Sequence, residues 1–404
     1  MALITGIFNI GKNPPELNLR SFAGTILRLF PNGSAPMFAL TSQSGKSRAV
    51  STTHGYFSKT MSFVKGVMGA AITDGVASTF NVTSTVGMTP NMVLYFPATR
   101  ENVRILTVVD ATSITVKRGY GRVAAAAIAN GATFFQVGTS FEEGSLRPIA
   151  RQLATVYIPN YTQIFRNAWG LTDTARASLA EMGYSNVAES RKDCSLFHST
   201  DIESAIIWGQ PVAPVIGPGG QPIHATQGVI DAMEQYAPQN TNAAAATTDF
   251  DQLVQLLEPA FAYSTDMANP KERVLFGDAQ AIRVIHEIGI RSGQVQILQS
   301  ETSFGMQFIR FKFYKGTINL IEHPLMNGLQ QSGMALVMDM PALKLAYMDG
   351  RDTRAEEYGS NGKILENGID GVGGSLTTEL CVELINPFSC ALITGLTAGA
   401  ANTP

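Results

Sequence analysis

Residues 173–210 read DTARASLAEMGYSNVAESRKDCSLFHSTDIESAIIWGQ and contain the longest helical pattern in the chain. The stretch has no proline, and Asp173 is suited to cap its N-terminus. Apolar side chains recur at steps of three to five residues: Leu179, Met182, Val187, Cys194, Phe197, Ile202 and Ala205. At 1.5 Å per residue this helix would be about 55 Å long, more than a compact domain needs. The narrow apolar stripe predicts a spine that spans two modules rather than a catalytic element.

The first 66 residues are basic and irregular. They carry breaker signals such as Asn13-Pro14-Pro15 and Pro31-Asn32-Gly33, with only short apolar pieces between them. Seven basic side chains and one acidic one give residues 1–66 a net charge of +6, whereas the rest of the chain carries −9. We expect an extended arm with an acidic partner, either nucleic acid or the acidic body of a neighbouring copy. A solvated arm is the alternative.

Residues 67–143 have the pattern of a compact β module. Two β-branched runs, Val103–Val109 and Ile114–Arg118, flank the turn-forming residues 110–113, which predicts a hairpin. Further short strands are expected at 80–85, 93–96 and 132–137.

A Gly/Pro-rich stretch, PVAPVIGPGGQP at residues 211–222, follows the spine and is typical of a linker. After it, helices alternate with strands in an α+β module of about 120 residues. We expect helices at 226–236, 249–263 and 278–291, and strands at 273–276, 294–300, 306–314 and 317–322. The chain closes with strands at 343–348, 376–385 and 391–393.

The composition of the 404 residues limits the class of protein. Charged side chains make up 15% of the chain, against about 25% in a typical soluble domain. Charge is depleted in this way at interface cores, although a neutral secreted protein would also show it. Three cysteines make no disulfide framework, and the N-terminus predicts no signal peptide. The uncharged stretch 123–141 is interrupted by polar residues and is not expected to cross a membrane.

Side chains of the kind used in catalysis are scattered. The five histidines show no spacing typical of a zinc site, and no Gly-x-Ser-x-Gly motif occurs. His286 and Glu287 are adjacent on a predicted helix and point in different directions, so a surface pair is favoured. Cys194 and His198 are four residues apart and would touch, but a cysteine on an apolar stripe usually packs.

Five other stretches hold residues of the kind that bind ligands, and each has a simpler structural explanation. The glycine clusters 217–220 and 371–374 match no phosphate-binding motif and are expected to be flexible loops. The acidic and basic segment MDGRDTRAEEYG, residues 348–359, is expected to be an exposed loop with ion pairs. IRFKFYKG at 309–316 alternates as any half-buried strand does. KRGYGR at 117–122 favours a tight turn over a phosphate nest, because no helix follows. We therefore predict no catalytic, cofactor-binding or metal-binding residue, no cofactor, and no enzyme.

The order of these elements resembles that of a known family. A basic arm, a β insertion that returns through FEEGSLRP (141–148), a long spine helix, an α+β module and C-terminal strands follow one another. This resembles the major capsid proteins of tailed bacteriophages with the Hong Kong 97-type (Johnson) fold, in the subfamily whose extended loop carries a β domain. The residues that carry the resemblance are ITVKRGYG (114–121), EEGS (142–145), NYTQIF (160–165) and TQGVIDAM (226–233).

The resemblance implies an α+β fold with four parts. These are an N-terminal arm (1–66), an extended loop with its β insertion domain (67–148), a peripheral domain (149–222 and 346–404, with the spine helix at about 173–210) and an axial domain (223–345). It implies a subunit that self-assembles as hexamers and pentamers into an icosahedral head shell around double-stranded DNA, in the host bacterial cytoplasm. Scaffolding, portal and decoration proteins are implied partners, DNA is contacted by non-specific electrostatics, and no membrane is involved. We expect neither a Lys–Asn cross-link nor removal of an N-terminal scaffolding segment.

Two other classes of protein remain open from the sequence. An encapsulin-like nanocompartment shell shares the fold, but the long β insertion argues against it. A secreted β-rich binding protein would behave as a monomer or small oligomer.

Overall fold

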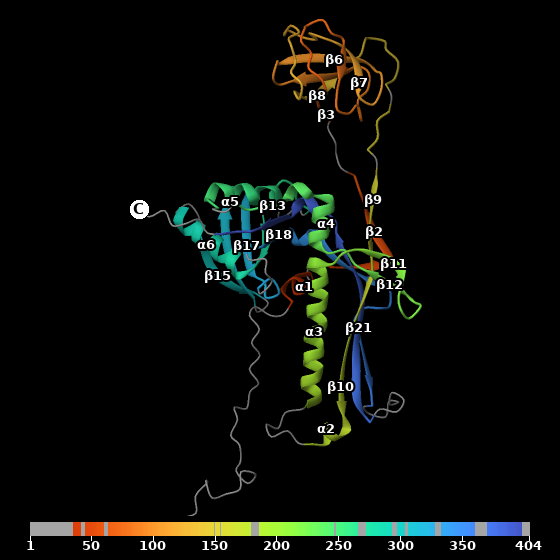
Figure 1. Ribbon diagram of the computed structural model, residues 1–404, viewed down its shortest axis with the longest axis vertical. Coiled ribbons are helices and arrows are strands. Elements are labelled where there is room, and N and C mark those ends of the chain that lie inside the picture. The colour runs from red at the N-terminus through yellow and green to blue at the C-terminus, as the bar shows by residue number, and fades with distance from the viewer. Residues whose placement is uncertain are drawn as a thin grey trace, which may run out of the picture. The chain divides into compact units, whose positions relative to one another are not determined.

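The computed structural model describes most of the chain, and Figure 1 shows its elements. The described residues are 35–41, 45–59, 64–148, 150–153, 155–178, 186–245, 248–265, 272–292, 297–303, 306–327, 333–359 and 370–397. They divide into two compact units, one made of residues up to Tyr56 together with those from Pro159 onward, the other of Phe57–Ile158. Residues 1–34, which hold most of the predicted arm, lie outside the described residues.

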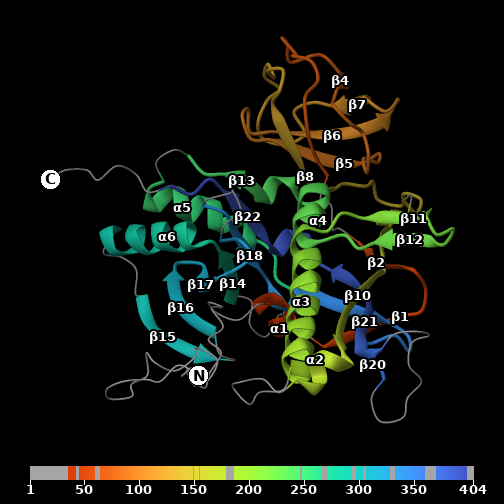
Figure 2. The same cartoon turned by 60° about the horizontal axis from the view of Figure 1, so that its bottom comes forward.

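The first unit contains a seven-stranded mixed sheet covered by two helices. Its strand order is β13-β22-β18-β14-β17-β16-β15. The strands are β13 (Thr241–Ala243), β14 (Glu272–Gly277), β15 (Ile297–Ser303), β16 (Met306–Phe313), β17 (Gly316–Glu322), β18 (Ala335–Met338) and β22 (Ala391–Thr394). Figure 2 shows the helices α5 (Phe250–Leu257) and α6 (Ala279–Ser292) beside the strands of this sheet. Leu253 of α5, Val284 of α6 and Leu275 of β14 belong to one buried cluster. The predicted α+β module is therefore present, with β18 added between the expected strands.

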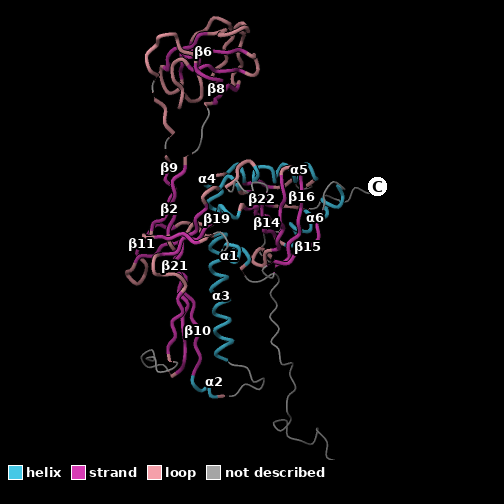
Figure 3. The backbone as a smooth tube through the Cα atoms, turned by 180° about the vertical axis from the view of Figure 1, so that it is seen from behind, coloured by secondary structure: helices cyan, strands magenta, loops and turns pink. Residues whose placement is uncertain are grey.

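A second sheet of the same unit runs along a long helix. Its path is β1 (Lys46–Ala49), β19 (Leu343–Met348), β21 (Gly371–Leu384) and β10 (Gln163–Thr172), and β20 (Arg354–Tyr358) also pairs with β21. Figure 3 shows β10 and β21 running beside the helix α3 (Asn186–Trp208). The remaining elements of the unit are α1 (Pro36–Thr41), α2 (Asp173–Ala177), α4 (Val229–Tyr236) and the 3₁₀ turns Pro238–Asn240, Glu258–Phe261, Met340–Ala342 and Pro387–Ser389.

The spine predicted over 173–210 is shorter in the structure. Thr172, rather than Asp173, caps α2 through a bond from the Ala175 N–H, and the helix ends at Ser178, whose backbone is extended. The main helix then occupies Asn186–Trp208. The residues that would join the two lie outside the described part. A single helix starting at Asp173 is therefore wrong, because the chain leaves helical geometry at Ser178.

The glycine-rich stretches 211–222 and 371–374, expected to be a linker and a loop, contain strands, whereas the cluster 217–220 is a turn, as expected of a loop. Residues 211–222 are no linker, because β11 (Val212–Ile216) and β12 (Pro222–Ala225) pair there as a hairpin around the turn of 217–220. Gly371–Gly374 begin β21 and pair with β10. A Cβ on Gly374 would lie 2.7 Å from Trp169 Nε1, so glycine allows the indole to cover the strand.

The second unit is a six-stranded antiparallel sheet with its own core. The chain passes into it through β2 (Thr53–Ser58) and out through β9 (Val156–Tyr161), which pair with each other. The sheet order is β3-β8-β5-β6-β7-β4. The strands are β3 (Lys65–Val67), β4 (Thr79–Asn81), β5 (Met92–Phe96), β6 (Glu101–Val108), β7 (Ser113–Lys117) and β8 (Thr133–Thr139). The expected hairpin at 110–113 joins β6 to β7, and Phe80, Phe96 and Phe134 lie in the buried core.

Candidate functional site

Cys194 and His198, the cysteine–histidine pair on the long helix, have structural roles in the core of the first unit. Cys194 is buried, and burial raises the pKa of its thiol, so the nucleophilic thiolate is disfavoured. The His198 ring contacts Asn167 Oδ1 through Nδ1 and Thr378 Oγ1 through Nε2, each at 2.8 Å. Burial lowers the pKa of His198, which favours the neutral ring. This histidine therefore ties α3 to β10 and β21.

The described residues contain neither a metal-binding cluster nor a membrane-spanning helix. Among the described residues, no three His, Cys, Asp or Glu side chains gather where they could hold a metal ion. No helix in the described part combines the length and the apolar character that a membrane span requires.

The acidic and basic segment 348–359 forms ion pairs, and residues 354–358 of it are strand β20 rather than loop. Asp352 pairs with Lys46 at 2.7 Å, and Asp349 pairs with Arg48. Both lysine and arginine belong to the predicted basic arm, so two of its cations face acidic side chains of their own chain. Exposed ion pairs of this kind add little to the free energy of unfolding. They connect β1 to the residues that follow β19.

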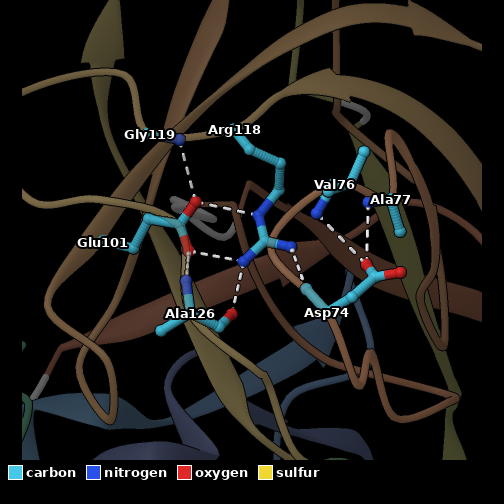
Figure 4. A network of polar contacts seen from close by, with 7 residues as sticks. All are labelled: Asp74, Val76, Ala77, Glu101, Arg118, Gly119 and Ala126. Carbon is cyan, nitrogen blue, oxygen red and sulfur yellow. Dashed lines mark hydrogen bonds and ion pairs between the residues drawn. The ribbon is translucent and has the colours of Figure 1, made fainter.

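The KRGYGR run forms a buried ion-pair network rather than a phosphate nest (Figure 4). Arg118 Nε and Nη2 donate to the two carboxylate oxygens of Glu101 at 2.8 and 2.7 Å. Arg118 also donates to the carbonyl oxygens of Asp74 and Ala126, and Glu101 accepts the Gly119 N–H. Four of the five guanidinium N–H groups are thus used within its own unit, and they tie the loops at Asp74 and Ala126 to Glu101 on β6.

Two sequence motifs that carried the family resemblance meet in the core of the first unit. Asn160 Oδ1 accepts the Gln227 N–H at 2.7 Å. Asn160 Nδ2 donates to the Val382 carbonyl at 2.6 Å and lies 3.2 Å from Thr226 Oγ1. NYTQIF and TQGVIDAM are therefore joined through one buried amide, which links β9, the start of α4 and β21.

The N-terminal segment is fixed at a buried carboxylate on α3. The N–H groups of Met37 and Phe38 donate to Glu203 Oε1 and Oε2 at 2.7 and 2.6 Å. His323 Nε2 lies 2.7 Å from Glu203 Oε1, and both side chains are fully buried. Nothing in the sequence marks this site, because a single glutamate in a long helix gives no indication of which residues contact it.

The β11–β12 hairpin exposes apolar side chains and no charge. Val215, Ile216 and Ile223 are 52%, 82% and 52% exposed. The sequence between Glu203 and Asp231 contains no Asp, Glu, Lys or Arg. An isolated two-stranded hairpin is marginal in water, and interface cores are depleted in charge. These features are typical of a protein–protein contact.

The comparisons with known proteins point to one family. The model of the SU10 major capsid protein family matches residues 4–397. The chain belongs to this family. It is 49% identical over 409 residues to the major capsid protein of Pseudomonas phage PaMx41, covering 98% of this chain and 97% of that protein.

Solved structures similar to the chain include phage and phage-like shells. A structure from Mycobacterium phage Bobi has a TM-score of 0.48 at 9% identity and covers 95% of this chain and 97% of that one. The capsid of a native GTA particle also has a TM-score of 0.48 at 9% identity, covering 97% and 98%. The SrpI encapsulin of Synechococcus elongatus has a TM-score of 0.43 at 12% identity, covering 62% and 81%.

Family membership confirms the resemblance drawn from the sequence. The chain is a phage major capsid protein, a subunit of the virion shell. Its helices and mixed sheets make it an α+β protein, as expected. Self-association is therefore its role, and the exposed hairpin is a candidate surface for it. The family supports neither the encapsulin-like alternative nor the secreted binding protein.

Proposed function

We propose that the chain assembles as hexamers and pentamers into an icosahedral head shell around double-stranded DNA, in the host bacterial cytoplasm. Family membership over residues 4–397 carries the proposal. The chain acts by assembly and has no enzymatic activity, no cofactor and no membrane partner. Scaffolding, portal and decoration proteins are its proposed partners besides further copies of itself.

The proposed domain organisation follows the four parts expected from the sequence. Residues 1–66 form the arm, 67–148 the extended loop with its β insertion, 149–222 with 346–404 the peripheral domain, and 223–345 the axial domain. The compact unit Phe57–Ile158 supports a separate insertion domain, although its bounds differ from 67–148. We propose that this unit contacts neighbouring subunits rather than a small ligand.

Charge supports a contact between copies. The segment 57–158 holds nine basic and five acidic side chains, whereas residues 159–404 hold fifteen basic and twenty-six acidic ones. A basic insertion and an acidic body attract each other between neighbouring subunits. The arm has a second possible partner, since packaged DNA would also attract Lys12, Arg20 and Arg28.

The test is the size of the assembled protein. The full chain is expressed alone and with a candidate scaffolding protein, then measured by light scattering and negative-stain imaging. Shells, tubes, or discrete hexamers and pentamers are expected. A protein that stays a 43.2 kDa monomer with the scaffold present, and that binds a small ligand, contradicts the proposal.

A further inference from the structure

Glu203, on α3, is a fully buried carboxylate that contacts no Lys or Arg side chain among the residues that the structure describes. In the part of the chain that the structure describes, the groups that meet it are two backbone N–H groups and the ring of His323. An ionised carboxylate away from water is costly unless each oxygen is hydrogen-bonded. The three N–H donors therefore stabilise the buried carboxylate of Glu203.

The proton on His323 can be placed from its second contact. The Leu325 N–H donates to His323 Nδ1 at 3.2 Å, so Nδ1 is the acceptor and the ring proton lies on Nε2. The Nε2–H then donates to Glu203 Oε1. A neutral ring in this tautomer leaves the negative charge of Glu203 to be stabilised by N–H donors alone.

One oxygen atom of this carboxylate joins two distant segments. Glu203 Oε1 accepts from both the Met37 N–H and His323 Nε2, while Oε2 accepts from the Phe38 N–H. Residues 35–41 contain no charged side chain, so these amides and the apolar packing of Met37, Phe38 and Leu40 on the core hold the segment in place. If either segment moves away, the Glu203 carboxylate is free to turn, and the hydrogen bonds from the other segment lose their geometry.

The turn after β17 connects Glu203 to the seven-stranded sheet through hydrogen bonds. The His323 N–H donates to the Gly277 carbonyl at 2.9 Å, and the Met326 N–H donates to the His323 carbonyl at 3.1 Å. Asn327 Oδ1 accepts the Ala279 N–H at 2.8 Å, at the first residue of α6. Residues 323–327 therefore link Glu203 to the end of β14 and the start of α6.

We propose that Glu203 is a conformational latch that couples docking of residues 35–41 to the position of the turn 323–327. Undocking of the N-terminal segment weakens the turn, and a shift of the turn weakens the docking, because both hold the Glu203 carboxylate in the one position that the other contact needs. Such coupling is reciprocal by thermodynamic linkage. The latch lies within one subunit, so it holds whether or not the proposed assembly is correct.

Hydrogen–deuterium exchange of the full-length chain tests the coupling from the side of the turn. His323→Phe removes the Nε2–H donor without touching residues 35–41, and we expect exchange at 37–41 to rise about tenfold. His323→Gln retains an N–H donor and is expected to restore much of the protection. Asp201→Asn, an exposed change on the same helix, is the matched control and should leave exchange at 37–41 unchanged.

A second pair of variants tests the coupling from the N-terminal side. Phe38→Pro removes the N–H that Glu203 accepts, whereas Phe38→Ala removes the ring and keeps that N–H. Exchange at 323–327 is expected to rise about tenfold in Phe38→Pro relative to Phe38→Ala, with β21 still protected in both.

The latch is overturned if exchange at 37–41 is the same in His323→Phe as in the unmodified chain while β21 stays protected. It is also overturned if the two Phe38 variants exchange alike at 323–327. Should His323→Phe lose protection in β21 as well, the Phe38 pair decides the question by itself.

Discussion

Buried polar side chains connect strands and loops that are distant in the sequence. Arg118 and Glu101 are 6% and 0% exposed and form a two-pronged pair inside the insertion unit. Burial would raise the pKa of Glu101, but the bonds from Arg118 and from the Gly119 and Ala126 N–H groups outweigh it and hold the pKa below its ordinary value. Such a pair contributes little over an apolar substitute, but removal of one partner leaves a buried charge unpaired.

Removal of the Glu101 charge tests this directly. Glu101→Gln should lower the unfolding free energy of the insertion unit by about 3 kcal/mol, because Arg118 then lies buried without a counter-charge. Chemical denaturation of the full chain, with exchange protection of β6 and β7 as the local probe, measures it. Glu143→Gln, an exposed change in the same unit, should fall within about 0.5 kcal/mol of the unmodified chain. Equal stability of the two variants contradicts the role of the pair.

The same residue predicts an acid response. The folded pKa of Glu101 lies below the ordinary value of 4.5, so the ionised form stabilises the unit fully above pH 4.5. That contribution is lost as the pH falls through the folded pKa. Exchange protection of β6 and β7 should therefore decrease on acidification below pH 4.5, and the Glu101→Gln variant should show a smaller decrease. Parallel titration curves for both chains would show that another group is responsible.

Two helices of the first unit approach each other closely at glycine residues, which have no side chain. The end of α3 and the start of α4 meet at Gly209 and Gly228, and the Gly228 N–H donates to the Gly209 carbonyl at 2.8 Å. A Cβ on Gly228 would lie 2.6 Å from the Gly209 nitrogen and 2.8 Å from the Ala205 carbonyl oxygen. These are backbone atoms, which cannot move aside without disturbing both helices.

Gly228→Ala should therefore destabilise the first unit by about 2 kcal/mol, as overpacking of a close contact does. Denaturant unfolding of the full chain measures the change. Gly219→Ala is the control, because a Cβ there meets nothing within 4 Å, and it should leave stability nearly unchanged. A stable Gly228→Ala chain would mean that the two helices can separate at no cost.

The β11–β12 hairpin gives a prediction for assembly at the same scale. Ile216→Lys places a charge on a side chain that is 82% exposed in the subunit, so folding should be unaffected. Burying that charge between copies would be costly, and the yield of assembled particles should fall at least tenfold. Ile216→Leu keeps the surface apolar and should assemble normally. Normal particle yield from Ile216→Lys, measured by light scattering, would place the hairpin outside the contact surfaces.

For the whole molecule, we propose two roles for the N-terminal region that a deletion series can separate. Met37 is fully buried in the main core with Phe165 and Ile202, while residues 1–34 precede this anchored segment. The anchored part contributes to the stability of the subunit, and we assign the preceding part to contacts in the shell.

A deletion of residues 1–34 should reduce particle formation and leave the unfolding free energy of the subunit close to that of the full chain. A deletion of residues 1–41 should also lower that free energy by about 3 kcal/mol or more, because it removes a buried methionine and two donors to Glu203. Circular dichroism during denaturation, together with light scattering, distinguishes the effects. Equal stability of the two truncated chains would contradict the anchoring role.

The sequence by itself determined the elements whose patterns are local. Alternating β-branched runs around 110–113 specified the hairpin of the insertion unit, and periodic apolar residues specified α4, α5 and α6. Tertiary structure decided the rest. Gly371–Gly374 form a buried strand only because β10 and β20 pair with them, and nothing local marks them as such. Glu203 likewise has its hydrogen-bond partners in Met37 and His323, which are 166 and 120 residues away in the chain. Contacts between such distant residues depend on how the whole chain packs, which local periodicity cannot encode.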